Sequence, residues 1–531
     1  MSEGGAGSRG PAAGGAGGLN AGGAAAATMS GGATVAGQSG DSGVGGSAGQ
    51  GTGATGATSG AAGTPGFGGA GAAGAGGSSG AAQGGMPAAG SGGAPEAGHG
   101  GKGGAACTAS QAVDLGAPAA DGFALKVQLA SDLLDTAPTT VGIVQWSLDA
   151  ACLTEAHIDF GLDTTYGMTA PVDLGKPGLR TVLVGMKPEK TYHFRIVATD
   201  ASQTRQSDDR TLQTGAATTL VPKHTVTVSQ PDKVDKGFFV GSYWQALSDA
   251  WYVAYIADTD GDIVWWYTDP SGMTSNDGIG RARLSADSQD IWMVRGQQFQ
   301  PVRRVSLDTL DVQVYDGDAA TTADDTRANH DICAVSGGTM AYVGSGSVAR
   351  CPAITELDRD GTTRVIFDAS SVTGDACHGN AIRYSKKQDL YVLSDRVTDV
   401  FVVDRAGNLK WKLSDKVSGG HDGWGGMQHG VELLDSSLLI FANHGVDLTH
   451  SQAIEFGLDG SVIKKFSSRY GSDYFGDVQR LPSGNTQINY GNGRIQQVDA
   501  DDNVVVEFVG ASTGYSEFRK SLYGEPIDIQ H

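Results

Sequence analysis

The first hundred residues of this 531-residue chain contain almost no charged or aromatic side chains. Between residues 1 and 105 the sequence is nearly all Gly, Ala, Ser and Thr, with Phe67 as the single aromatic residue. Such a segment cannot bury enough apolar surface to offset the entropy that is lost when its backbone is ordered. This lack excludes a globular domain and predicts that residues 1–106 form a disordered, flexible tether.

Long apolar runs and basic residues are also scarce. No run of eighteen apolar residues occurs, which excludes an ordinary transmembrane helix. The chain has 58 Asp and Glu against 37 Lys and Arg, so its formal net charge is -21. This balance argues against nucleic acid as a partner, because nucleic acid selects basic surfaces. It is compatible with a soluble protein in an extracytoplasmic or extracellular space.

A targeting signal is not visible at the start of the sequence. MSEGGAGSRG has neither the basic segment nor the apolar segment of a signal peptide. A long Gly/Ala/Ser tether nevertheless fits an exported protein. We therefore expect a periplasmic, outer-surface or secreted protein whose sequence starts near the mature end, after a lipoprotein signal, with a lipid or surface anchor at the tether.

Cysteine is rare, with five residues, and none of them forms a Cys-x-x-Cys pair. A zinc site is therefore not expected, and we predict no bound metal. In an exported protein these cysteines would form disulfides. Cys107 with Cys152 and Cys351 with Cys377 are two pairings that fit, but sequence leaves the connectivity open. The odd count leaves at least one thiol free or paired between chains.

Short strand-like runs separated by turn residues fill residues 107–216. VGIVQWSL, EAHIDFG, TVLVGM and YHFRIVATD have the composition of strands. The stretch from Met186 to Asp200, MKPEKTYHFRIVATD, resembles the late strands of a fibronectin type III module, in which a Pro-containing turn precedes a tyrosine, here Tyr192. We therefore expect a fibronectin type III-like β-sandwich, most simply a spacer.

One phrase recurs from residue 217 onward. Each copy is a strand ending near Asp, a tight turn centred on Gly, Asn or Asp, and a second strand with an aromatic residue. The copies are YIADTDGDIVWWY (255–267), RVSLDTLDVQVYD (304–316), ITELDRDGTTRVIFD (354–368), FVVDRAGNLKWKLSD (401–415), AIEFGLDGSVIKKFS (453–467) and IQQVDADDNVVVEFV (495–509). Six copies give about 50 residues per unit, the size of a propeller blade. The prediction is an all-β fold with a six-bladed β-propeller over residues 217–531.

Three histidines stand directly before apolar strands of this predicted propeller. They are His330 in NHDICAV, His378 in CHGNAIRY and His429 in QHGVELL. A propeller gathers the starts of its innermost strands around one end of the central channel, so these side chains are expected to converge. A single histidine at such a point is more often structural, but three at equivalent points in separate blades favour a functional site.

With their neighbours, these residues resemble the bacterial arylsulfate sulfotransferases that work without phosphoadenosine phosphosulfate. The family pattern has a His-Asp, a His-x-Asn-Ala/Ser-Ile, a Ser-x-Arg, and a Gln-His opening a hairpin that closes on Asn-Gly. The matching stretches are His330-Asp331, His378-Gly379-Asn380-Ala381-Ile382, Ser394-Asp395-Arg396, and Gln428-His429 with Asn443. Two departures are His444, which interrupts the closing Asn-Gly, and Asn329, which stands where the family has a second His.

The resemblance implies a ping-pong transfer between an aryl sulfate donor and a phenolic acceptor. His429 would attack the sulfur, form a sulfohistidine and release a phenol, and a second phenol would then take the sulfuryl group. Arg396 would bind the sulfonyl oxygens with its planar donor fork. His330 and His378, as donors, would complete the pocket or protonate the leaving oxygen.

Other polar residues have weaker assignments. Asn380 and Gln428 are expected to bind substrate by orienting these groups, and Trp424 would stack on an aryl ring if its Gly-rich loop reaches the site. The aspartates of the repeated turns lack the spacing of a calcium loop, so we expect them to cap the turns. The family that the sequence resembles needs no organic cofactor, and no Gly-rich phosphate loop occurs in this sequence. We therefore predict no cofactor.

Two other functions are compatible with these features. A non-catalytic propeller that binds a ligand or a protein partner is favoured by the tether and the sandwich, which look like display architecture. A hydrolase would use the same residues and pass the sulfuryl group to water, because the acceptor depends on pocket shape. The full set of His330, His378, Arg396 and His429 favours an enzyme, since a binding protein has no reason to keep all four around one axis.

Overall fold

The computed structural model describes residues 113–526 with short gaps. The gaps are 150–151, 244–251, 270–277, 286, 296–300, 316–327, 348–350, 374–377, 397–398, 415–426, 444–449 and 511–513. The predicted tether, residues 1–106, therefore lies outside the described residues. Strands predominate in the described part, so the all-β prediction is confirmed. None of the helices found there is long and apolar enough to cross a membrane.

Two antiparallel sheets near the start of the described chain share one core. The first has the order β1 (Phe123–Leu129), β2 (Gly142–Leu148), β5 (Thr181–Leu183). The second has the order β4 (Gly167–Pro171), β3 (Leu153–Gly161), β6 (Thr191–Asp200), β7 (Thr204–Gln206), with β8 (Arg210–Gln213) also paired to β6. Apolar residues alternate along the strands, so Trp146 from one sheet packs with Phe160 and Phe194 from the other in a single buried cluster.

Six further antiparallel sheets follow in the described chain. The first three have the orders β33 (Ser516–Arg519), β10 (Phe238–Ser242), β11 (Tyr252–Asp258), β12 (Ile263–Asp269); β13 (Ile279–Leu284), β14 (Asp290–Arg295), β15 (Val302–Ser306), β16 (Val312–Tyr315); and β17 (Ile332–Ala334), β18 (Met340–Ser345), β19 (Pro352–Leu357), β20 (Thr363–Asp368). The others are β21 (Gly379–Ser385), β22 (Leu390–Asp395), β23 (Val400–Asp404), β24 (Leu409–Lys412); β25 (Gln428–Leu433), β26 (Ser437–Ala442), β27 (Gln452–Gly457), β28 (Val462–Lys465); and β29 (Asp477–Arg480), β30 (Thr486–Asn489), β31 (Arg494–Val498), β32 (Val504–Val509), β9 (Thr225–Val228). The short helices are α1 (Ser370–Thr373) and the 3-10 turns Ala130–Asp132, Pro177–Leu179, Pro231–Lys233 and Ser336–Gly338.

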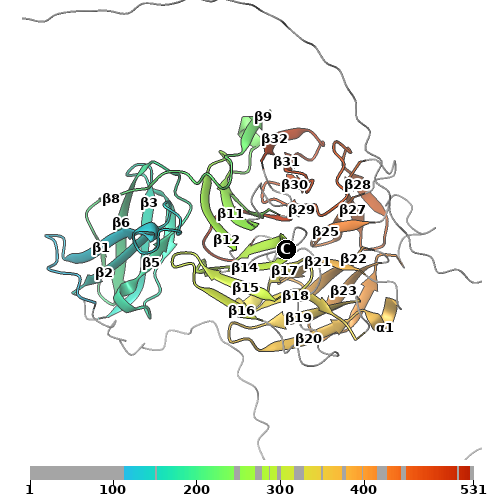
Figure 1. The fold of residues 1–531 in the computed structure, drawn as a ribbon, viewed down its shortest axis with the longest axis horizontal. Helices are drawn as coiled ribbons and strands as arrows, with labels where there is room; N and C mark the ends of the chain where they lie inside the picture. Colours follow the sequence, from blue (N-terminus) through green and yellow to red (C-terminus); the bar gives the residue numbers. More distant parts are fainter. Residues whose placement is uncertain are drawn as a thin grey trace, which may run out of the picture. The chain divides into compact units, whose positions relative to one another are not determined.

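The six sheets follow one another around a common centre (Figure 1). Their first strands are in contact in the order β13, β17, β21, β25, β29, and β33 contacts both β29 and β13, which closes a ring. Two strands distant in sequence secure the closure, because β33 pairs with β10 of the first sheet and β9 pairs with β32 of the last. The arrangement is propeller-like, and it brings the starts of the inner strands together.

The repeated phrases of the sequence are the hairpins distal to the ring centre. They correspond to β11–β12, β15–β16, β19–β20, β23–β24, β27–β28 and β31–β32. Glycines with positive φ, such as Gly261 and Gly407, allow the tight turns. The first aspartate of a turn accepts backbone hydrogen bonds within it, as Asp258 does from the amides of residues 260 and 262 at 2.9 Å. Turn capping is thus confirmed for Asp258.

The sandwich and the ring belong to one compact unit, residues 95–531. Val141 and Ile143 of the sandwich share a buried apolar cluster with Ile256 and Trp265 of the first ring sheet. At the edge of this contact, Nζ of Lys187 lies 3.0, 2.6 and 3.2 Å from carboxylate oxygens of Asp258, Asp260 and Asp262. We call these four residues the lysine latch.

Two of the five cysteines are seen in disulfides. Cys152 and Cys351 are each disulfide-bonded. Cys107 and Cys377, the partners that fit the sequence, lie outside the described residues. The expectation that the chain forms disulfides is therefore met, and the pairing stays a prediction.

Candidate functional site

Three histidines and an arginine meet at one end of the ring. His330 lies just before β17, His378 just before β21, His429 in β25, and Arg396 just after β22. The imidazole centroid of His330 lies 5.1 Å from that of His378 and 6.3 Å from that of His429. The charge of Arg396 is near enough to help lower the pKa of both His330 and His429, after the larger effect of burial. We call these four residues, all expected from the sequence, the histidine cluster.

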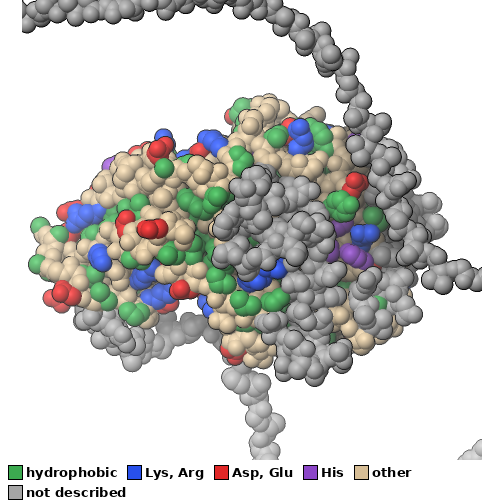
Figure 2. Space-filling view, viewed as in Figure 1, with side chains coloured by type: hydrophobic (Ala, Val, Ile, Leu, Met, Phe, Trp, Pro, Cys, Tyr) green, Lys and Arg blue, Asp and Glu red, His purple; other side chains and the backbone are tan. Residues whose placement is uncertain are grey.

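The four residues of the histidine cluster differ in burial. His330 is 9% exposed and His429 is 3% exposed. His378 and Arg396 are only partly buried. On the face drawn in Figure 2, histidine side chains lie beside a Lys or Arg side chain in the region where Figure 1 labels β22 and β25. His378 and Arg396 are therefore the members of the cluster nearest to solvent.

An asparagine fixes the proton on the ring of His429. Nδ1 of His429 lies 2.5 Å from Oδ1 of Asn443, and the amide nitrogen of Asn443 donates to the carbonyls of Phe475 (2.7 Å) and Ser472 (3.0 Å). Because two acceptors hold that nitrogen, the amide oxygen faces the imidazole and Nδ1 carries the proton. Nε2 then keeps its lone pair. Burial, aided by the charge of Arg396, lowers the pKa of His429 to about 3, so the ring is neutral.

The same device orients His330. Its Nδ1 lies 2.5 Å from Oδ1 of Asn329, whose amide nitrogen donates to the carbonyl of Gly379 at 3.2 Å. Burial, and then the neighbouring His378, hold the pKa of His330 well below its usual value. Neutral His330 therefore offers Nε2 as an acceptor, and a donor role at that atom requires protonation. Asn329 is one of the two positions at which the sequence departs from the pattern that it resembles.

Asn380 and Gln428 join strands beside the cluster. The amide nitrogen of Asn380 donates to the carbonyl of Gln428, and the amide nitrogen of Gln428 donates to the carbonyl of Asp395, both at 2.6 Å. Only their oxygens, which have no hydrogen-bond partner in the described part of the chain, remain for the predicted substrate contacts. Trp424, the third predicted binding residue, lies outside the described residues, as does His444.

Sequence analysis missed an aromatic wall behind the histidines. The ring centroid of Phe475 lies 5.8 Å from that of His330 and 6.1 Å from that of His429. Tyr515 packs against Phe475 at 5.3 Å, and its hydroxyl donates to the carbonyl of Asn380 at 2.5 Å. Phe475 precedes the inner strand β29 much as His330 precedes β17, and this equivalence was the signal available in the sequence.

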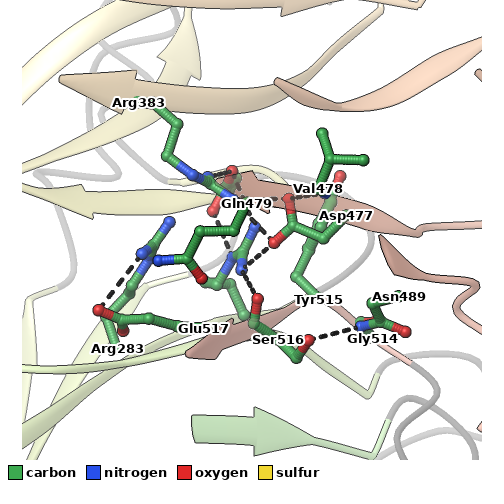
Figure 3. A network of polar contacts seen from close by, with 12 residues as sticks. Arg283, Arg383, Asp477, Val478, Gln479, Asn489, Gly514, Tyr515, Ser516 and Glu517 are labelled. Carbon is green, nitrogen blue, oxygen red and sulfur yellow. Dashed lines mark hydrogen bonds and ion pairs between the residues drawn. The ribbon is translucent and has the colours of Figure 1, made fainter. Parts of the chain in front are cut away.

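A closed set of buried charges adjoins the cluster (Figure 3). Nε of Arg281 lies 2.7 Å from Asp331, and its Nη1 lies 2.6 Å from Asp477. Nη1 of Arg383 lies 2.7 Å from Asp331, and its Nη2 lies 2.8 Å from Asp477. Each arginine thus bridges both aspartates. We call Arg281, Asp331, Arg383 and Asp477 the charge ring; it was not predicted from the sequence.

Three neighbouring imidazoles raise the question of a metal centre. A zinc ion would need its ligand atoms to converge at about 2 Å from one point. Within the described ranges, no group of three or more His, Cys, Asp or Glu residues has an arrangement that could hold a metal ion. We assign no metal or cofactor to the cluster.

Comparisons with known proteins assign no family. No family model matches the sequence, and no curated protein matches it. Among solved structures, the C-terminal WD40 domain of Sif2 is similar over 66% of this chain and 84% of that domain, with 10% sequence identity and a TM-score of 0.33. A similarity at this level carries no argument about activity, so function has to be inferred from the residues of the site.

Proposed function

We propose that this protein is an arylsulfate sulfotransferase that forms a sulfohistidine at His429. One observation carries the proposal. A buried, neutral imidazole keeps its Nε2 lone pair beside the partly exposed guanidinium of Arg396, with two further imidazoles next to it. A nucleophile with a fixed tautomer and a cation for the sulfonyl oxygens are the two groups that sulfuryl transfer needs most.

We further propose that the six sheets are the blades of a six-bladed β-propeller and that the sandwich is a fibronectin type III-like module. The closed contact order of the inner strands supports the first. The hydroxyl of Tyr192 accepts a hydrogen bond from the backbone N–H of Lys187 at 2.8 Å, as in the tyrosine corner of such sandwiches. The disulfides at Cys152 and Cys351 support an extracytoplasmic location.

In the first half of the reaction, Nε2 of His429 attacks the sulfur of the aryl sulfate. The N–S bond forms, the S–O bond to the aryl group breaks, and the electron pair leaves on the phenolate oxygen. The ring of His429 becomes positive, and its Nδ1–H is held by the amide oxygen of Asn443. Arg396 stabilises the charge on the sulfonyl oxygens.

The leaving oxygen receives a proton in this scheme from His378. His378 is the most exposed of the three imidazoles, so it exchanges protons with water more readily than His330. In the second half, the acceptor phenol attacks the sulfur and gives its proton to His378. The N–S bond breaks, and His429 returns to its neutral form.

A transfer assay tests the proposal. Residues 95–531 are mixed with 4-nitrophenyl sulfate, with and without a second phenol, beside the His429→Ala variant. We expect acceptor-stimulated release of 4-nitrophenol that His429→Ala abolishes, and a sulfuryl adduct on His429 detected by mass spectrometry. His157→Ala, which removes a histidine of the sandwich, is the matched control and should retain full activity.

The same assay separates the competing functions. Release that does not depend on the acceptor, with the adduct still at His429, would identify a hydrolase. Absence of release from a series of aryl sulfates by folded protein would overturn the proposal and favour the non-catalytic binding propeller.

A further inference from the structure

We propose that Asp331 and Asp477 are positioning residues of the site, an inference that rests on the proposed function. The charge ring that they form with Arg281 and Arg383 holds the two turns that deliver His330 and Phe475 to the histidine cluster. Asp331 acts through His330, which precedes it directly, and Asp477 acts through Phe475, which lies two residues before it.

The charge ring links four sheets across the centre of the molecule. Arg281 lies in β13, Asp331 just before β17, Arg383 in β21 and Asp477 at the start of β29. Their side chains are 0%, 0%, 5% and 2% exposed, respectively. Because each guanidinium fork spans both carboxylates, a shift of any one of the four strands breaks two ion pairs.

The charges in the ring are balanced, with two arginines against two aspartates. Burial alone would raise the pKa of Asp331, but the charges of Arg281 and Arg383 bring it down to about 2, so the carboxylate stays ionised. A buried ion pair of this kind contributes little net stability, whereas removing one partner leaves an uncompensated charge. The ring is therefore better suited to fixing geometry than to stabilising the fold.

Both aspartates anchor turns with an unfavourable backbone. His330 has φ 62° and Phe475 has φ 55°, values that side chains other than glycine rarely adopt. Asp331 accepts from the amide of Ile332 (2.8 Å), and Asp477 accepts from the amide of Val478 (3.0 Å). Each carboxylate thus binds the residue that follows it and two arginines, which fixes the turn from outside.

The neighbouring sheet is tied to the same carboxylate. The other oxygen of Asp331 accepts from the amide of Ile382 in β21 at 3.0 Å. His378 lies at the start of β21, so Asp331 relates the turn of His330 to the strand that positions His378. The 5.1 Å spacing between these two imidazoles therefore depends on this carboxylate.

A second route connects the charge ring to His429. The guanidinium of Arg281 lies 4.2 Å from the ring centroid of Tyr515, a cation–π contact. Tyr515 packs 6.4 Å from His429 and donates to the carbonyl of Asn380. Loss of either aspartate would free Arg281 to move under Tyr515, so the disturbance would reach all three histidines.

Glu517 provides a matched control within the same central region. Its carboxylate is buried and lies 3.6 Å from Arg283 (Figure 3). The same carboxylate lies 3.4 Å from Arg519. It lies in β33, which carries none of the cluster histidines. Glu517→Gln and Asp331→Asn therefore each remove one buried negative charge that faces two arginines. Only Asp331 is adjacent in sequence to a histidine of the cluster, His330.

The experiment compares Asp331→Asn, Asp477→Asn and Glu517→Gln in residues 95–531. The first readout is kcat and KM with 4-nitrophenyl sulfate. We expect kcat to fall about 100-fold in both aspartate variants, because a misplacement of about 1 Å costs that much. KM should stay within about threefold, since Arg396 directly follows β22 and lies in neither turn. Glu517→Gln should change kcat less than about threefold.

The second readout needs no turnover. Diethyl pyrocarbonate labels neutral imidazoles, and mass spectrometry measures the rate at each histidine of the cluster. We expect Asp331→Asn to raise the labelling rate of His330 at least about fivefold, and Glu517→Gln to leave it unchanged. Equal labelling rates of His330 in the two variants would overturn the positioning proposal, whether or not the wild type turns over an aryl sulfate. Inactivity of the wild type would count against the proposed function alone.

A balanced variant covers the case in which Asp331→Asn does not fold. Arg281→Met combined with Asp331→Asn removes one charge of each sign and leaves Arg383 and Asp477 as a complete pair. We expect this protein to fold and to show the same increase in His330 labelling. If the folded double variant labels His330 at the wild-type rate, the turn keeps its conformation without Asp331. That result would contradict the positioning role.

Discussion

The charge ring and the lysine latch are both sets of opposite charges, but they lie in different surroundings. In the charge ring all four side chains are 0–5% exposed. In the latch the exposed fractions are higher, from 10% for the side chain of Asp258 to 56% for that of Asp260. The latch also has substitutes, because Lys223 pairs with Asp262 and Lys236 pairs with Asp260.

The difference indicates what each set can do. Water and salt screen charges at the surface, so the latch can form and break at little cost. In the charge ring the four side chains are almost fully buried, so a charge that loses its partner is left uncompensated. The lysine latch, between sandwich and ring, is therefore an ionic contact that tolerates change, whereas the charge ring, next to the candidate site, is one that does not.

The largest effect is expected from Arg383→Met. This variant leaves Asp331 and Asp477 to share Arg281, and one buried carboxylate loses its compensation. We expect the free energy of unfolding to fall by about 3–5 kcal/mol, measured by chemical denaturation at pH 7.5. A loss below about 1 kcal/mol would mean that the charge ring tolerates the loss of a partner as well as the latch does, and the proposed difference between them would be wrong.

Asn443→Ala tests how much is lost when a neutral hydrogen-bonding group, rather than a charge, is removed from this region. Without the amide oxygen, the tautomer and the orientation of His429 are no longer fixed. We expect kcat to fall about 10- to 100-fold, as for other groups that orient a reacting imidazole. Asn492→Ala, which removes an exposed asparagine, serves as the control. Equal kcat in the two variants would contradict the role given to Asn443.

The pH dependence of kcat/KM follows from the burial of His429. Its pKa is lowered from 6.5 to about 3, so the nucleophile stays neutral well below the range of an ordinary histidine. We expect kcat/KM, which reports the free enzyme, to show no loss centred near pH 6.5 between pH 8 and pH 5. A decline with a midpoint near 6.5 would mean that His429 titrates as an exposed histidine and that the cluster is open to water.

The same shift predicts how stability changes with pH. A lowered pKa in the folded state means that the unfolded chain binds the proton more readily, so stability rises with pH in that range. For His429 the contribution is complete above pH 6.5 and is lost as the pH falls toward 3. For Asp331 the loss comes lower, between about pH 4 and pH 2. Denaturation curves at pH 7.5, 5 and 3.5 should show the first loss before the second.

Local features could be predicted from the sequence. The repeated turns are recognisable in the sequence by Gly, Asp and Asn at positions that need positive φ. The hairpins were found where they were expected. The three histidines were found because each stands directly before an apolar strand. Their convergence followed from the repeat, since equivalent positions in a ring of sheets come together.

Long-range pairs could not be predicted in this way. Arg281 and Arg383 stand among apolar residues of inner strands, and this was a visible sign that they have buried partners. The partners are 50 to 196 residues away, however, and no spacing rule relates them. Asn443 was noted only as part of a motif, because its effect on His429 depends on which way its amide points.

The smallest effect is expected from Lys187→Met, and it completes the comparison. Burial would lower the pKa of Lys187, but Asp260 and the two neighbouring aspartates raise it above its usual value, so the ammonium is held charged. Its removal leaves Asp262 paired with Lys223, Asp260 paired with Lys236, and Asp258 bound to the backbone amides of its own turn. We expect a loss of about 0.2–1 kcal/mol in the free energy of unfolding, with no change in kcat.

The loss caused by Lys187→Met should shrink further at 1 M NaCl, where the screening length is about 3 Å, while the effect of Arg383→Met should persist. Equal salt sensitivity of the two variants would mean that water reaches the centre of the ring, and the distinction between the two sets of charges would be wrong.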